Sequence, residues 1–128
     1  MAKIERFEDL KIWQEAVEIE VEIIYLFQKE KKLEREFEIK NQLTAAGLSI
    51  SNNIAEGFEY NNNPDFKRFL RFAKGSTGEC RNIFYVIKKS KLADEKNCDE
   101  MILRLESLSR QIKSLIDYLN NRNKDDKK

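Results

Sequence analysis

Residues that make a chain turn are scarce in this sequence: its 128 residues include one proline, Pro64, and four glycines. A fold built from β-strands needs many short turns, and proline and glycine are among the residues that form them most readily. The scarcity therefore favours a few long helices over an all-β or α/β fold.

Apolar residues that recur every three and four positions predict four helices, at 9–30, 33–59, 64–91 and 94–121. The connections between them are short, so consecutive helices must run antiparallel. The expected fold class is all-α, an up-and-down antiparallel four-helix bundle. We expect a single domain over residues 1–122 and a frayed tail at 123–128.

Cap residues and apolar stripes give the expected starts and inner faces of these helices. Asp9, Asn63 and Asp94 are cap types, and Pro64 suits the first helical position. The residues expected to point inward are Ile12, Ala16, Ile19, Ile23, Leu26, Leu33, Phe37, Leu43, Ala46, Ile50, Ile54, Phe66, Phe69, Leu70, Ala73, Thr77, Cys80, Phe84, Ile87, Met101, Leu105, Leu108, Ile112, Leu115 and Leu119. A second stripe on the first helix, Trp13, Val17, Val21 and Ile24, predicts a broad buried face there.

The composition points away from an enzyme, a metal site and a membrane anchor. The chain has no histidine, and it carries no phosphate-binding glycine loop or nucleophile motif. No apolar run approaches the ~20 residues that span a bilayer, so a cytoplasmic location is expected. Cys80 and Cys98 are expected to be reduced core thiols, and Glu56 and Glu79 to lie near buried positions as hydrogen-bond or cap residues. We expect no enzymatic activity, no cofactor and no small-molecule substrate.

The segment from Asn41 to Ala55 has fifteen residues without a charge, in a chain of which 37% of the residues are charged. An ordinary bundle helix keeps a charged outer face, so this half-helix is expected to be covered on more than one side. We favour a subunit interface that includes Ala45, Ser49, Asn52 and Asn53. A loop or the tail covering this face within one subunit, or a neutral solvated surface, are the alternatives.

The first and third predicted helices carry charge of opposite sign. Residues 8–30 hold seven acidic side chains and two lysines, whereas residues 64–91 hold eight basic side chains and two acids. Lys67, Arg71 and Lys74 step by four and three, which predicts a basic stripe opposite the core. Such a stripe binds nucleic-acid phosphates, pairs with an acidic helix, or faces water. From the residues alone, nucleic acid is the minority interpretation.

Several segments together resemble a known family of bacterial four-helix bundle proteins, those encoded by intervening sequences of large-subunit ribosomal RNA genes. These segments are 7–16 (FEDLKIWQEA), Ser49-Ile50, 53–57 (NIAEG), 68–71 (RFLR), Ala73, Gly75-Ser76 and Glu79. The resemblance covers almost the whole chain. Three positions depart from the family pattern, in two places: Ser51 and Asn52 replace a proline and serine, and Cys80 replaces a leucine. The first departure implies a second helix without a proline kink.

The resemblance implies a small cytoplasmic bundle that assembles as a ring, commonly a homopentamer, with no established enzymatic activity. Relatives of the family look similar to the accessory protein of diversity-generating retroelements, a basic pentamer that works with a reverse transcriptase and nucleic acid. The resemblance makes RNA or DNA the leading expected partner besides the chain itself. The expected phosphate contacts are Lys67, Arg68, Arg71, Lys74 and Arg81. The alternative is a protein-interaction scaffold whose basic helix pairs with acidic helices.

Overall fold

The computed structural model describes residues 3–126, and these residues form helices without any strand. The elements are the 3-10 helix η1 (Phe7–Asp9) and the α-helices α1 (Lys11–Lys29), α2 (Lys31–Glu34), α3 (Phe37–Glu59), α4 (Asn63–Lys89) and α5 (Glu95–Asp126). The all-α class expected from the sequence is confirmed for this part of the chain.

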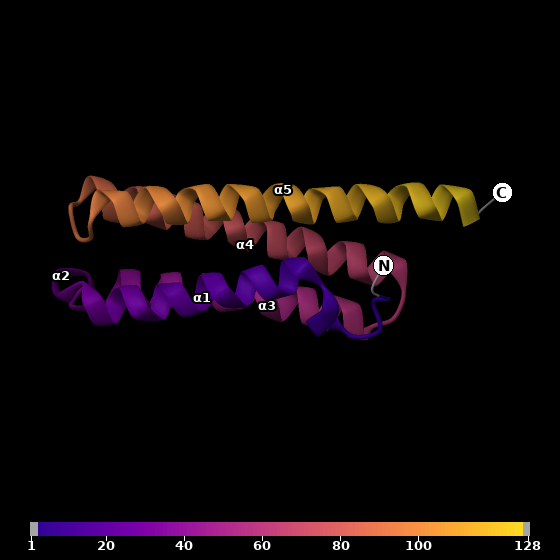
Figure 1. Ribbon diagram of the computed structural model, residues 1–128, viewed down its shortest axis with the longest axis horizontal. Helices are drawn as coiled ribbons and strands as arrows, with labels where there is room; N and C mark the ends of the chain where they lie inside the picture. The colour runs from indigo at the N-terminus through magenta and orange to yellow at the C-terminus, as the bar shows by residue number, and fades with distance from the viewer. Residues whose placement is uncertain (1–2, 127–128) are drawn as a thin grey trace.

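The four long helices lie side by side with short connections at their ends, and α2 is a single turn at one end (Figure 1). α4 packs along both α3 and α5, and α1 packs along α3. α1 makes much less contact with α5 than α4 does. The seam between α1 and α5 is therefore the loosest of the four.

The expected helix cap at Asp9 is wrong. The Asp9 carboxylate accepts the backbone N–H groups of Glu5 and Arg6, at 3.1 and 3.3 Å, and so closes the turn of η1. The chain is extended at Leu10, and α1 begins only at Lys11.

The expected start of the second helix at residue 33 is also wrong, because the helix is interrupted between Glu34, where α2 ends, and Phe37, where α3 begins. Leu33 is fully buried as expected, but it belongs to α2. Phe37 begins α3 and is 73% exposed. At about 3.6 residues per turn, the register that buries Leu43 and Ile50 turns position 37 away from the core. Farther along, α3 is continuous across Ser51 and Asn52.

The second stripe of α1 is not a buried face. Trp13 and Val17 are partly buried, but Val21 and Ile24 are 39% and 44% exposed. The prediction of a broad buried face is therefore wrong at these last two residues. α1 instead leaves these two apolar side chains exposed at its surface.

The α3–α4 turn is capped one residue earlier than expected. Asn62, not Asn63, is the cap, and its Oδ1 accepts the N–H of Asp65 at 2.9 Å. Pro64 lies in the first turn of α4 as expected. Asn61 has a φ of 59°, a left-handed conformation that asparagine tolerates well.

The start of α5 is close to the predicted one, whereas its end is not. Asp94 Oδ1 accepts the N–H of Lys96 at 2.8 Å, which confirms Asp94 as a cap. The helix continues to Asp126, past the expected end at residue 121. Residues 127 and 128 of the predicted tail lie outside the described residues, and the domain boundary at 122 stays a prediction.

The hydrophobic core runs between the four long helices and follows the predicted stripes closely. Phe66 and Leu115 are only partly buried, and Phe37 is exposed, but the other residues expected to point inward are buried. Cys80 and Cys98 are buried free thiols, as expected. Burial raises the pKa of Cys80 to about 12 and that of Cys98 to about 11, so both stay protonated and unreactive at neutral pH.

Candidate functional site

The basic residues of α4 divide between two sides of the helix. Lys67, Lys74 and Arg81 follow one another at seven-residue intervals and are all partly buried. Lys67 Nζ donates to Asn120 Oδ1 of α5 at 3.0 Å. At the far end of the same row, Lys88 contacts Asp99 at 2.7 Å and Glu95 at 3.6 Å, also on α5. This row therefore follows the seam between α4 and α5.

Arg68 and Arg71 lie on the outer side of α4, where both are exposed. Arg68 makes a 3.4 Å ion pair with Asp65, and its guanidinium carbon lies 4.8 Å from the centroid of the Phe69 ring. The single stripe expected from Lys67, Arg71 and Lys74 is thus split, with Arg71 facing outward and the two lysines beside α5. The residues named as phosphate ligands nevertheless remain on one helix.

Three of the predicted phosphate ligands have no charged partner within the described part of the chain. Arg71, Lys74 and Arg81 make no side-chain hydrogen bond or ion pair with residues 3–122. A cationic group that is not neutralised by its own protein is available to an external anion. Arg71 is the most accessible of the three.

Two acidic residues of α1 form ion pairs with an arginine of α5 in the same subunit. Arg104 of α5 contacts Glu15 at 3.1 Å and Glu18 at 3.8 Å. These contacts bridge the loose seam between α1 and α5. Part of the acidic charge of α1 is therefore balanced without α4.

The predicted subunit-interface residues also fall into two pairs. Ala45 and Asn52 are exposed on α3, as a contact surface requires. Ser49 and Asn53 are partly buried, and the Asn53 amide donates to the Ser49 carbonyl and hydroxyl at 2.8 and 2.9 Å. Ser76 of α4 lies 3.0 Å from the Ser49 hydroxyl, so the second pair links α3 to α4.

Between residues 41 and 55 the outer side of α3 is uncharged and open, and its largest exposed apolar side chain, Leu48, was not among the predicted interface residues. Leu48 is 48% exposed between Ala45 and Asn52. Because these three residues are exposed, no described loop or tail segment covers them, and the alternative of a covering loop or tail is wrong for the described part of the chain. Ile24 of α1 is also exposed, and it lines a hollow together with Thr44 of α3. We call Ala45, Leu48, Asn52 and Ile24 the uncharged face.

A buried carboxyl group lies under this face. Glu20 of α1 is 7% exposed and points at Gly47 of α3, so closely that a side chain on residue 47 would collide with Glu20 Oε2. Within the described residues, Oε2 has no hydrogen-bond partner. Burial raises the pKa of Glu20 to about 7. Glu56 and Glu79, expected near buried positions, are themselves exposed and adjoin buried Gly57 and Cys80 in the sequence.

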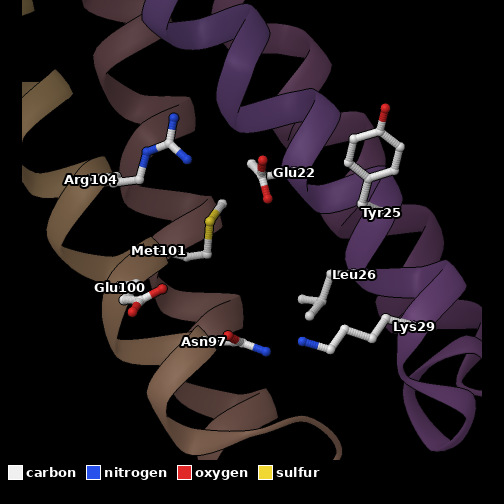
Figure 2. A pocket seen from close by; sticks show the side chains of 8 residues that line it. All are labelled: Glu22, Tyr25, Leu26, Lys29, Asn97, Glu100, Met101 and Arg104. Atoms are coloured by element: carbon white, nitrogen blue, oxygen red, sulfur yellow. The ribbon is translucent and has the colours of Figure 1, made fainter.

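A small hollow opens at the loose seam between α1 and α5 (Figure 2). The lining residues are Glu22, Tyr25, Leu26 and Lys29 of α1 and Asn97, Glu100, Met101 and Arg104 of α5. Its volume is about 140 Å³, below the ~300 Å³ at which ligand pockets begin. Two acidic and two basic side chains line the hollow, so neither sign of charge dominates. Lys29 and Asn97 point toward each other across it (Figure 2). Its geometry fits no catalytic arrangement.

No cluster of three or more histidine, cysteine, aspartate or glutamate side chains suited to a metal ion occurs among the side chains of residues 3–122. None of the described helices has the length and apolar character needed to cross a bilayer.

These features define a class of protein: a small all-α chain of long packed helices, with one basic helix and one uncharged outer face. The model of the 23S rRNA-intervening sequence protein family matches residues 8–114. The chain belongs to this family, which confirms the resemblance seen in the sequence.

A solved structure shows the same fold. It is the crystal structure of a protein of unknown function from the S23 ribosomal protein family of Bacteroides thetaiotaomicron. The similarity has a TM-score of 0.73 at 19% sequence identity, and it covers 82% of this chain and 97% of the other. No curated protein matches this chain.

Proposed function

We propose that this protein is a cytoplasmic, non-enzymatic scaffold, an antiparallel four-helix bundle that forms homo-oligomers and associates with RNA or DNA through α4. The observation that carries the proposal is the set of cations Arg71, Lys74 and Arg81, which have no charged partner among residues 3–122, on a helix rich in basic residues.

Binding of this kind depends on charge rather than on base sequence. Lys and Arg side chains that neutralise phosphates release condensed counterions, so affinity falls as salt rises. Base readout needs a helix or strand that enters a groove, whereas the seam with α5 runs along one side of α4 and Lys67 is held there by Asn120. We therefore expect contacts to the sugar-phosphate backbone and little sequence preference.

Reversing two charges on α4 should weaken RNA binding by about tenfold or more, because two phosphate contacts become repulsive. The variant is Arg71→Glu with Lys74→Glu, measured by filter binding across a salt series. The slope of affinity against salt should also become shallower. Lys11→Glu with Lys29→Glu, two exposed lysines of α1, is the matched control and should bind at least tenfold better than the α4 variant. Absence of any wild-type binding at low salt contradicts the proposal.

A protein-interaction scaffold is the second candidate function. It is favoured by Lys88, which already pairs with Asp99 and Glu95 and shows how carboxylates engage the basic side chains of α4. In this case α4 pairs with acidic helices of neighbouring subunits or of a protein partner. The α4 charge reversal would then dissociate the oligomer and leave RNA binding unchanged, which light scattering on the same variant detects.

The uncharged face supports the homo-oligomer, and the family resemblance favours a pentamer. Leu48→Glu should dissociate the assembly to subunits of 15.2 kDa, because the contact would have to bury a charge without a partner. Analytical ultracentrifugation measures the mass, and circular dichroism should show unchanged helicity. Gln111→Glu, at an exposed position of α5, is the control and should keep the wild-type mass. A wild-type monomer contradicts the assembly itself.

A further inference from the structure

Aromatic side chains collect around the α3–α4 turn. The ring of Tyr60 is stacked on that of Phe69, with centroids 5.2 Å apart and an interplanar angle of 12°. Phe72 meets Phe69 edge-on at 5.8 Å. Phe69 is 9% exposed, whereas Tyr60 and Phe72 are 50% and 51% exposed. One buried ring thus holds two exposed rings in place.

The two exposed rings sit on a rigid support. Phe69 packs tightly on α3: a Cβ added at Gly57 would lie 2.6 Å from the Cβ atom of Phe69. The turn that carries Tyr60 is fixed by the left-handed Asn61 and the Asn62 cap. Rigid aromatic rings lose little conformational entropy when another ring stacks on them, which favours binding.

Two arginines lie beside the rings. Arg68 lies over the Phe69 ring at 4.8 Å, and Arg71 follows it on the outer side of α4. The ion pair of Arg68 with Asp65 is long, 3.4 Å, and both side chains are more than a third exposed, so it competes weakly with another anion. At Gly75, one turn beyond Arg71, an added Cβ would meet no atom within 4 Å. The helix surface is therefore open next to the cations.

From this arrangement we propose that Tyr60 and Phe72 stack on bases of a single-stranded nucleic acid, while Arg68 and Arg71 contact its phosphates. Aromatic rings with adjacent cations are the combination by which proteins bind single strands. The faces of bases in a duplex are covered by their neighbours, so a stacking surface selects unpaired segments. The inference rests on the proposed function and names its ligand class.

Fluorescence anisotropy with a labelled 20-nucleotide RNA and with a duplex of the same sequence tests the inference. Loss of one stacked base lowers affinity by roughly five- to a hundredfold. Tyr60→Ala and Phe72→Ala should each lower single-strand affinity by about tenfold and leave duplex affinity within twofold. Tyr60→Phe keeps the ring and should bind like the wild type. Tyr25→Ala removes a tyrosine that is 57% exposed on α1 and serves as the matched control.

The outcomes separate this inference from the proposed function. If single strand and duplex bind equally, and only the α4 charge reversal weakens them, α4 binds nucleic acid but the stacking inference is wrong. If neither ligand binds the wild type, both proposals fail. If Tyr60→Ala or Phe72→Ala lowers the mass in solution, the aromatic rings are a contact between copies of the chain, and the inference is overturned. Circular dichroism confirms that each variant is folded.

Discussion

At pH 8.5, replacing Glu20 by methionine should add about 3 kcal/mol to the free energy of unfolding by removing a buried charge. Any effect of the substitution that does not depend on pH comes on top of this gain. Burial raises the pKa of Glu20 from 4.5 to about 7. Each pKa unit corresponds to about 1.4 kcal/mol of differential stability. The wild type bears this cost whenever its carboxyl group is ionised, whereas methionine has a similar length and no charge.

The sign of the pH dependence follows from proton linkage. Between pH 4.5 and about 7 the folded protein holds the Glu20 proton and the unfolded chain releases it. The free energy of unfolding therefore falls as pH rises through this window. Below it the carboxyl group is neutral in both states, so the difference between variant and wild type should shrink to the pH-independent part. Near pH 5 the remaining pH-dependent part is under about 1 kcal/mol.

Urea unfolding at pH 5 and pH 8.5 measures both values. Glu22→Met is the matched control, because Glu22 is exposed two residues farther along α1. Its stability should follow the wild-type pH profile. Parallel profiles for Glu20→Met and the wild type would show that Glu20 finds a partner or water and is not buried as an unpaired acid.

Spacing in the sequence predicted most of the fold, because apolar stepping reports the buried face of each helix directly. It placed Leu70, Phe84 and Leu105 in the core without error. It failed where no residue marks a break: the segment 29–36 has no glycine or proline, so the separate turn of α2 and the outward Phe37 were not foreseen. Val21 and Ile24 show a second limit, since a stripe does not reveal whether a neighbour covers it.

The candidate site was predicted in part. The basic residues of α4 are visible as a charge excess in the sequence, but their division between the α5 seam and the outer side depends on packing. Tyr60 and Phe69 stack across a turn, and Glu20 faces Gly47 from another helix. Such contacts between elements have no periodic signal along the chain. Only the arrangement of the helices reveals them.

The same substitution, glycine to alanine, should have opposite effects at two positions of the chain. At Gly57 a new Cβ would lie 2.6 Å from Phe69 Cβ. That atom is attached to the backbone of α4, so the helices themselves must move apart. Overpacking of this kind costs roughly 1–3 kcal/mol, and we expect Gly57→Ala to lower the free energy of unfolding by about 3 kcal/mol. At Gly75 a new Cβ meets nothing within 4 Å, so Gly75→Ala should raise it by about 1 kcal/mol through helix propensity.

Thermal and urea unfolding of both variants measure these changes, and the comparison also bears on function. A shift of Phe69 in Gly57→Ala moves the ring that supports Tyr60 and Phe72. Single-strand affinity should therefore fall along with stability, whereas Gly75→Ala should leave the rings in place. Equal stabilisation by both substitutions would mean that α3 and α4 do not meet closely at Gly57. That result would also contradict the inference that Phe69 is a rigid support for Tyr60 and Phe72.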